Sequence, residues 1–516
     1  MFTLFLMIHA LWSQNIPIAM DHPIYPFLEK HESLGHLNGE YWSTRPYTYD
    51  QIHKMFAEIE NSESELSPSD KAIFQRFRLE FNREFAEDGI TLPWSRSSLN
   101  RLRHPDERAP KPFFISYKQD ETVGWINWSE NFRVQNNGLA SRGYFTDFIG
   151  ISGQKGRLSF TSEFTLHRLT RNDKYSELPD TYKEGFLLDR DYIKWINWNY
   201  PTSSLVYTDS DFSLGIHRQP VYWGYSADNS PILSDNVQSF PYIEWSTSIK
   251  HLRFKFMHAR LSPNDQPQMD TLNARRNLSA QRVEFDISPA LEFAFNEMVV
   301  YSHRDFELGY LNPVNFLFAE EQVQGDLDNK LMALDFKWRA SPGLTTYGTW
   351  FFDELDFWKL FSGWWGNKFV FQLGVTYYPK LNLPSFNLEY TAARPWTYSH
   401  RYPVNSFTSA GRILGLQAGP NTETISLNTD WQISPSLDIQ GILDFYKRGI
   451  DLGSNPLTSY VERGNFENED QHFIVGDLEY WSNWIISLDY YLSSITKFNM
   501  SFNNKDQIEL GIKIDW

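Results

Sequence analysis

Two histidines near the amino terminus have a spacing that invites comparison with a metal site. The stretch HESLGH places His31 and His36 five residues apart. On a helix this spacing separates two side chains by about 140°, whereas a helical zinc motif needs both histidines on one face. Gly35 and the turn-forming residues around it also argue against a helix. We therefore expect neither a helix nor a metal site in this stretch.

Other residues with catalytic potential lack the arrangement that catalysis requires. Ser152 lies in GISG, which does not have the spacing of a nucleophile elbow and falls inside an alternating segment. The carboxylates Asp353, Glu354 and Asp356 could serve a glycosidase, but acidic loops are common in a chain with 64 Asp and Glu. The absence of cysteine excludes a catalytic thiol and thiolate metal sites. We expect a protein that is not an enzyme and has no cofactor.

Several irregular stretches combine flat aromatic rings with amides and carboxylates. Such stretches suit sugars, because rings stack on the CH faces of a sugar while amides and carboxylates bind its hydroxyl groups. The best candidate is FSGWWGNKF, and QPVYWGYSADNSPILSDN is a second. The alternative is that these rings form the interfacial girdle of a membrane barrel. The candidate polysaccharide-binding residues are Trp364, Trp365, Asn367, Lys368, Trp223, Asp235 and Asn236.

The elements that must position these residues are strands, because from about residue 112 apolar and polar side chains alternate. In RLSFTSEFTLH one face is apolar and the other carries Ser, Thr, Glu and His. The segments 252–257, 334–339, 437–447 and 484–493 behave alike. The polar faces carry full charges, which suits a hydrated lumen better than the core of a sandwich. We expect an antiparallel transmembrane β-barrel of about 18 strands, each near the length that crosses a bilayer.

The composition agrees with a barrel and excludes other classes. Aromatic residues make up 17% of the 516 residues, while the mean hydropathy is −0.48. Beyond the first residues there is no run of 18 apolar residues, so helical membrane spans are not expected. The formal charge of −17 argues against a nucleic-acid partner. A large secreted β-protein, a sandwich or a propeller, is the alternative at this stage.

The amino-terminal fifth of the chain is predicted to be helical. Residues 1–14 read as a signal peptide, and residues 15–110 as a helical segment before a barrel at 111–516. Thr48 and Gln51 form a capping box before the apolar stripe Ile52, Met55, Phe56 and Ile59. Ser67 caps a second helix, which presents Phe74, Phe77, Phe81 and Phe85 and reaches a C-terminal cap at Gly89. We expect the two stripes to pack together and close the periplasmic mouth.

The chain stops on the strand QIELGIKIDW. Glu509, Gly511, Ile514 and Trp516 fit the pattern polar-x-Gly-x-x-apolar-x-aromatic at the carboxyl terminus. This pattern resembles the signal that outer-membrane barrels present to the barrel-assembly machinery. Because termini fray unless they are tied down, a strong strand here is expected to pair with an early strand and close a barrel.

Five stretches in order resemble the Wzi capsule-assembly family: STRPYTYDQI, ILSDN with FPYIEW, NPVNF with GDLDN, WWGNK and LGLQAGPN. The resemblance runs from about Ser43 to the end of the chain. It implies an outer-membrane barrel of eighteen strands with a small periplasmic helical bundle, exported through the periplasm and surrounded by outer-membrane lipid. It also implies a lectin that holds capsular or exopolysaccharide at the cell surface. The alternative is a porin-like channel or transporter for oligosaccharides or other solutes.

Overall fold

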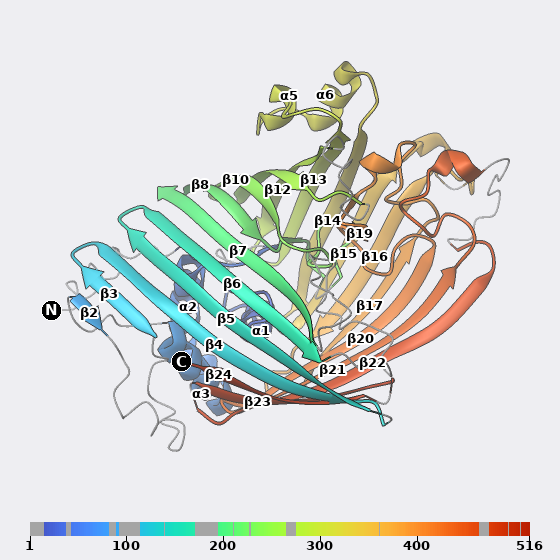
Figure 1. Cartoon of the computed structure of the whole chain (residues 1–516). Coiled ribbons are helices and arrows are strands. Elements are labelled where there is room, and N and C mark those ends of the chain that lie inside the picture. Colours follow the sequence, from blue (N-terminus) through green and yellow to red (C-terminus); the bar gives the residue numbers. More distant parts are fainter. Residues whose placement is uncertain are drawn as a thin grey trace.

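A closed antiparallel barrel forms most of the molecule (Figure 1). The computed structural model describes residues 15–37, 43–81, 89–91, 114–138, 140–170, 195–209, 211–226, 229–264, 275–360, 362–463, 474–493, 495–505 and 507–516. The barrel has eighteen strands, which confirms the predicted number. Within the described residues, no helix is long and apolar enough to cross a membrane.

The barrel strands follow the chain in simple order, each hydrogen-bonded to the next. They are β4 (Thr122–Asn136), β5 (Ser141–Lys155), β6 (Leu158–Thr170), β7 (Trp195–Asp209), β8 (Phe212–Gln219), β10 (Phe240–Ile249), β11 (Leu252–Leu261), β12 (Arg276–Ser288), β13 (Leu291–Ser302), β14 (Asn329–Ser341), β15 (Leu344–Glu354), β16 (Lys368–Tyr377), β17 (Ser385–Ala393), β20 (Thr422–Ser434), β21 (Leu437–Gly449), β22 (Leu478–Tyr491), β23 (Thr496–Asn503) and β24 (Ile508–Asp515). Two short strands, β3 (Ile115–Gln119) and β2 (Gly89–Thr91), extend the sheet beside the start of β4.

The last strand closes the barrel. β24 pairs with β23 on one side and with β4 on the other, from Ile508 opposite Asn136 to Asp515 opposite Ser129. The backbone N–H of Trp516 continues this ladder by donating to the carbonyl of Trp128, 2.8 Å away. The predicted pairing of the final strand with an early one is confirmed.

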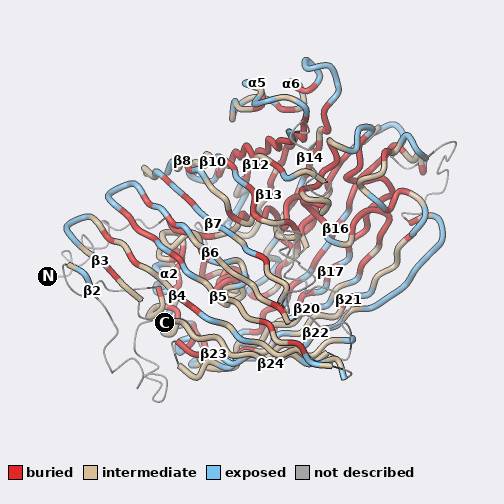
Figure 2. Tube along the Cα trace, viewed as in Figure 1, coloured by how far each residue is buried: buried red, intermediate tan, exposed pale blue. Residues whose placement is uncertain are grey.

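The burial pattern is inverted relative to that of a soluble protein. In β6, Leu158, Phe160 and Phe164 are exposed, whereas the alternating Ser159 and Thr161 are buried. Exposed and buried segments alternate along the strands of the wall in the same way (Figure 2). An apolar outer face and a polar inner face are what a strand between lipid and a lumen requires. The structure therefore favours the membrane barrel over a secreted β-protein.

The two ends of the barrel differ in the length of their connections. At one end, β5–β6, β10–β11, β12–β13, β14–β15 and β20–β21 are joined by two residues each. At the other end, the connections after β8, β13, β17 and β21 span 220–239, 303–328, 394–421 and 450–477. Short periplasmic turns and long extracellular loops are typical of outer-membrane barrels. The long loops carry β9 (Tyr222–Trp223), α5 (Leu308–Leu311), α6 (Leu317–Gln324), η4 (Phe357–Lys359), η5 (Pro403–Asn405), β18 (Thr408–Ser409), β19 (Arg412–Ile413) and η6 (Tyr460–Arg463).

Three helices lie at the end with the short turns, one more than the sequence predicts (Figure 1). They are α1 (Ile24–Leu34), α2 (Tyr49–Asn61), followed by the short η2 (Glu63–Glu65), and α3 (Pro68–Phe81). The expectation that HESLGH is not helical is wrong, because His31 lies in the last turn of α1. Gly35 ends that helix in the left-handed conformation, at φ 89°, which glycine adopts without the steric cost of a Cβ. His31 and His36 share a hydrogen bond between their Nδ1 atoms, 2.8 Å apart.

The predicted N-terminal caps of the other two helices are confirmed, as are the described residues of their apolar stripes. The Thr48 hydroxyl accepts from the Gln51 N–H, and the Ser67 hydroxyl accepts from the N–H of Asp70. Phe56 meets Phe74 edge to face at a ring separation of 5.2 Å. Phe85 lies outside the described residues, as do the other residues between Phe81 and Gly89, so the predicted C-terminal cap at Gly89 stays a prediction. Gly89 itself begins strand β2.

The helical bundle is fastened to the inner wall and the short turns. Lys337 of β14 forms an ion pair with Glu32 of α1 at 3.0 Å, and the Ser33 hydroxyl lies 2.7 Å from that of Thr345. At the turn between β20 and β21, the Arg76 guanidinium of α3 donates to the carbonyl of Pro435, 2.8 Å away. Polar bonds from α1 and α3 therefore hold the bundle against the short-turn end of the barrel.

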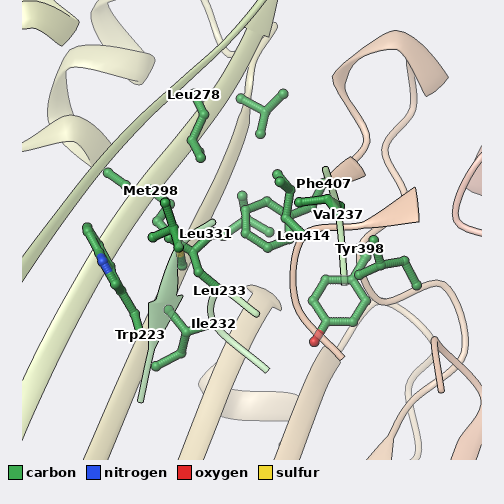
Figure 3. Close-up of a cluster of buried hydrophobic side chains, with 14 of the residues drawn as sticks. Trp223, Ile232, Leu233, Val237, Leu278, Met298, Leu331, Tyr398, Phe407 and Leu414 are labelled. Carbon is green, nitrogen blue, oxygen red and sulfur yellow. The ribbon is translucent and has the colours of Figure 1, made fainter. Parts of the chain in front are cut away.

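Two long loops fold back and fill one half of the lumen. Trp223, Leu233 and Val237 from the first loop meet Tyr398, Phe407 and Leu414 from the second (Figure 3). They pack on small or apolar inward residues of the wall, which include Leu278, Ala280, Met298, Leu331, Ala333 and Ala393. The loops are also tied by the Tyr398 hydroxyl, which donates to the carbonyl of Pro231 at 2.9 Å.

The bundle and the folded loops meet inside the barrel. The short strand β1 (Thr44–Arg45), which follows α1, pairs with β9 of the first loop, Thr44 opposite Trp223. The Ser43 hydroxyl beside it hydrogen-bonds to Glu284 and lies 2.6 Å from an Arg282 nitrogen on the wall. Protein therefore fills this half of the lumen from the bundle to the long loops.

Candidate functional site

A row of aromatic side chains crosses three loops at the long-loop end of the barrel. The ring of Trp364 lies 5.8 Å from that of Trp365, which in turn lies 5.7 Å from Tyr460. His400 continues the row at 6.4 Å from Tyr460, and Tyr402 follows at 5.7 Å from His400. We call these five residues the aromatic row.

Cations accompany the aromatic row. Lys359 Nζ lies 4.1 Å from the centre of the Trp364 ring, and Lys368 Nζ lies 4.1 Å from that of Tyr460. At the far end, the Arg401 guanidinium lies 5.0 Å from the Tyr402 ring. Ring faces next to cations attract both the CH faces of sugars and carboxylates on them. The aromatic row therefore has the chemistry of a glycan-binding surface.

Four of the five rings of the row are exposed to solvent, at least in part. Trp364, Trp365 and Tyr460 are partly exposed, and Tyr402 is 42% exposed. His400 is buried, and burial together with the nearby Lys368 charge lowers its pKa to about 4, so its imidazole is neutral at neutral pH. Burial raises the pKa of Tyr460 to about 12, and its hydroxyl stays protonated. The charged groups beside the row are Lys359, Lys368 and Arg401, together with the carboxylates Asp356 and Glu354 that pair with the two lysines.

Asn367 and Lys368 support the loop from beneath. The Asn367 side chain accepts from the Asp356 N–H at 2.7 Å and donates to the Lys359 carbonyl at 2.8 Å. The side chain of Lys368 is fully buried and forms an ion pair with Glu354 at 3.2 Å. Both residues are at the predicted site, but their contacts are with the protein: Asn367 holds the loop that carries the two tryptophans, and Lys368 lies against the Tyr460 ring.

The residues predicted around Trp223 lie elsewhere. Trp223 is only 1% exposed and belongs to the hydrophobic core in the lumen, where its ring has no free face for a sugar. Asn236 donates its amide to the carbonyl of Ile413 at 2.9 Å and so joins the two folded loops. Asp235 stands beside it, partly exposed. This stretch holds the loops in place, and we do not include it in the candidate site.

The partners that the sequence did not point to are His400, Tyr402 and Tyr460. They come from two loops that lie 30 to 100 residues from the tryptophans in the chain, and no spacing pattern connects them. The only available signal was that SHRYPVN and LTSYVER are irregular stretches with isolated aromatics between strands. The fold of the long loops creates the row.

Three residues of the predicted insertion signal lie on β24 beside β4, and Trp516 directly follows that strand. Glu509 accepts from Arg133 at 2.9 Å across the seam of the barrel. Gly511 stands opposite Arg133 and Asn499, where an added Cβ would meet the Asn499 side chain. Ile514 pairs with Glu130, and the Trp516 indole N–H donates to the carboxylate of Glu130 at 3.3 Å. The geometry closes the barrel, and the role as an insertion signal stays a prediction.

The fold has counterparts among solved structures. The chain is similar to Wzi of Escherichia coli, described as an outer-membrane protein involved in group 1 capsule assembly and as a carbohydrate-binding β-barrel. The identity is 10%, the match covers 98% of this chain and 99% of that one, and the TM-score is 0.57. No family model matches the sequence, and no curated protein matches it either.

Other similar solved structures match a smaller share of this chain. They include OprD of Pseudomonas aeruginosa, with 10% identity, 76% of this chain and 94% of that chain covered, and a TM-score of 0.43. OccAB2 of Acinetobacter baumannii has 9% identity, coverages of 77% and 98%, and a TM-score of 0.43. We draw no argument from these weaker matches. The match over nearly the whole of both chains shows that this protein has the fold of a Wzi-like outer-membrane β-barrel.

Proposed function

We propose that this protein is a surface lectin of the outer membrane, which attaches capsular or exopolysaccharide to the cell through the aromatic row. The fold supports the location, because a barrel with an apolar outer face must lie in a membrane and barrels of this kind lie in the outer membrane. The row lies on the long loops, which face the cell exterior in such barrels. The Wzi structure, a carbohydrate-binding barrel of the same fold, agrees with this function.

The folded loops that fill one half of the lumen are the observation that carries the proposal. Loops 220–239 and 394–421 pack on the inner wall, and β9 pairs with β1 of the bundle. A pore for solutes needs a continuous aqueous path, whereas a lectin needs only a rigid surface that presents its rings. The loops are held by a buried apolar core, and so they form a fixed support for the row.

The aromatic row suits a long polymer better than a small sugar. Each stacked ring contributes about 1 kcal/mol, and hydrogen bonds that compete with water contribute about as much. One sugar unit would therefore bind weakly. A repeating polysaccharide that lies along several rings, and on many copies of the protein, gains by avidity. We expect firm retention of polymer and weak binding of its single repeat unit.

Separate Trp364→Ala and Trp365→Ala variants test the proposal. In a strain that lacks the native gene, at least one variant should reduce cell-associated polysaccharide while the barrel still inserts. Trp338→Ala is a matched control, because Trp338 is 49% exposed on the outer face of β14 and belongs to the lipid-facing side. Inserted barrels with full polysaccharide retention in both variants would contradict the proposal.

A channel for solutes is the second candidate, and one observation favours it. The half of the lumen opposite the folded loops contains a cavity of 800 Å³, lined by polar residues of β4–β8 and β21–β24 and by the bundle. If the bundle moved, this half could conduct. The two candidates therefore differ in whether the intact protein passes ions.

A further inference from the structure

The cavity in the second half of the lumen has a defined wall. Its 800 Å³ lie within the range of small-molecule sites, which is about 300–1,000 Å³. Phe81 and Tyr49 of the bundle bound it at the short-turn end, while Arg133 and Glu509 line it near the other end of the barrel. The strands β4 and β5 are joined there by residues 137–140 only. The cavity thus extends towards the exterior.

The register of β4 to β7 places aromatic and hydrogen-bonding side chains in alternating positions on one inner wall. Phe148 stands beside Thr165, which stands beside Tyr200. One row nearer the long loops, Thr146 stands beside His167. One row nearer the short turns, Glu163 stands beside Thr202 and accepts a hydrogen bond from its hydroxyl group at 2.6 Å. We call these seven residues the luminal patch.

The rings and polar groups of the luminal patch face the cavity. All seven side chains are partly exposed and line the cavity. On the neighbouring strand β4, the buried atoms Asn131 Oδ1 and Arg133 Nε have no hydrogen-bond partner in the described part of the chain. Buried polar atoms without partners are costly. A bound molecule with several hydroxyl groups would satisfy them while its apolar faces stack on Phe148 and Tyr200.

The charges around the cavity select against anions. Its three lining cations are already paired: Arg133 with Glu509 at 2.9 Å, Lys497 with Asp489 at 2.9 Å, and Lys513 with Asp515 at 3.6 Å. The other lining carboxylates are Asp21, Glu80 and Glu163. An acidic sugar would therefore meet excess negative charge in a site shielded from solvent.

We propose that the luminal patch is a second binding site, which takes a neutral oligosaccharide of about three hexose units and is distinct from the aromatic row. The alternating rings and hydroxyl or carboxylate groups match the alternating apolar faces and hydroxyl edges of such a ligand. The inference does not depend on polysaccharide binding at the row, since the lining of the cavity alone carries it.

The test uses the full-length protein in detergent and saturation-transfer NMR. The probes are three neutral trisaccharides (maltotriose, cellotriose and β-1,4-galactotriose) and one acidic trisaccharide, trigalacturonic acid. At least one neutral trisaccharide should receive saturation, and trigalacturonic acid should receive less. The Tyr200→Ala variant should raise the Kd of the bound neutral trisaccharide by about 3- to 10-fold, as the loss of one stacked ring does, while Tyr200→Phe should retain binding.

Two controls separate this site from the row and from misfolding. Trp365→Ala should leave binding of the neutral trisaccharide unchanged, and each variant should migrate as a heat-modifiable folded barrel. If Tyr200→Ala does not fold, Glu163→Gln takes its place. It keeps every ring of the luminal patch and should likewise raise the Kd of the neutral trisaccharide. The proposal fails if no neutral trisaccharide binds, if trigalacturonic acid is preferred, or if Trp365→Ala alone abolishes binding. In the first case the cavity contains water only.

Discussion

Lys337 allows the attachment of the helical bundle to be measured. Its Nζ lies 3.0 Å from a carboxylate oxygen of Glu32 on α1 and 3.0 Å from one of Glu292 on β13, and its side chain is only 7% exposed. A Lys337→Met substitution keeps the apolar stem but leaves the two carboxylates near each other without the cation between them. Removing one partner of a buried ion pair costs about 3–5 kcal/mol. Most of this cost should appear as a weaker attachment of α1.

Hydrogen exchange of the detergent-solubilised protein measures that attachment. A loss of 3 kcal/mol from the opening free energy corresponds to about 100-fold faster exchange, so amides of α1 should exchange faster while those in the middle of β14 stay protected. Lys255→Met is the matched control. Lys255 forms a similar ion pair with Glu244 at 3.2 Å, between two strands of the wall. Equal exchange of α1 in both variants would refute the conclusion that Lys337 fastens the bundle.

Three further predictions concern pH, the folded loops and the closing strand. Burial lowers the pKa of His31 and of His36 below the ordinary 6.5, so the unfolded bundle binds protons more readily than the folded one. The bundle should therefore lose stability as pH falls below about 6.5. Hydrogen exchange of α1, corrected for the intrinsic rates, would contradict this if it were the same at pH 7.5 and pH 5.5. At Gly415 an added Cβ would collide with the carbonyl of Pro231, so Gly415→Ala should make the folded loops sensitive to protease on intact cells. Gly124→Ala is the control and should not, because its Cβ would lie 3.5 Å from the nearest backbone atom. Deleting Trp516 or changing Gly511 to Asp should impair insertion of the barrel. The deletion removes the hydrogen bond to the Trp128 carbonyl, and the Asp side chain would collide with Asn499. Yields of heat-modifiable outer-membrane protein equal to those of the wild type would refute this prediction.

The periodic parts of the fold were predictable from the sequence because they follow local rules. The alternation around Phe160 identifies a strand with one apolar face, and the terminal run to Trp516 identifies a paired strand. The caps at Thr48 and Ser67 mark helix starts through side-chain bonds to nearby N–H groups. Helix α1 was missed, although Ile24, Phe27, Leu28 and His31 have helical spacing and all four are buried. Attention to Gly35 as a breaker concealed its role as a cap.

The candidate site was predictable only in part, because long loops have no periodicity to read. FSGWWGNKF could be found from its composition, yet the same reasoning selected Trp223, whose ring is buried. Composition indicates that a tryptophan contacts something flat and apolar, but not whether this is a sugar or the interior of the protein. Tyr460 and His400 join the tryptophans only through the fold of loops that are distant in sequence. The luminal patch likewise depends on the register of β5, β6 and β7.

Ion conductance in a planar lipid bilayer tests the central claim most directly. If the bundle and the folded loops close the lumen, the intact protein should show no stable open channel. A truncated chain without the residues up to about Arg108 lacks the bundle, including Glu32, the partner of Lys337 on α1. It should insert and conduct through the half of the lumen that contains the 800 Å³ cavity. Stable conductance of the intact protein, at the level of the truncated chain, would contradict the plugged lectin and favour a channel.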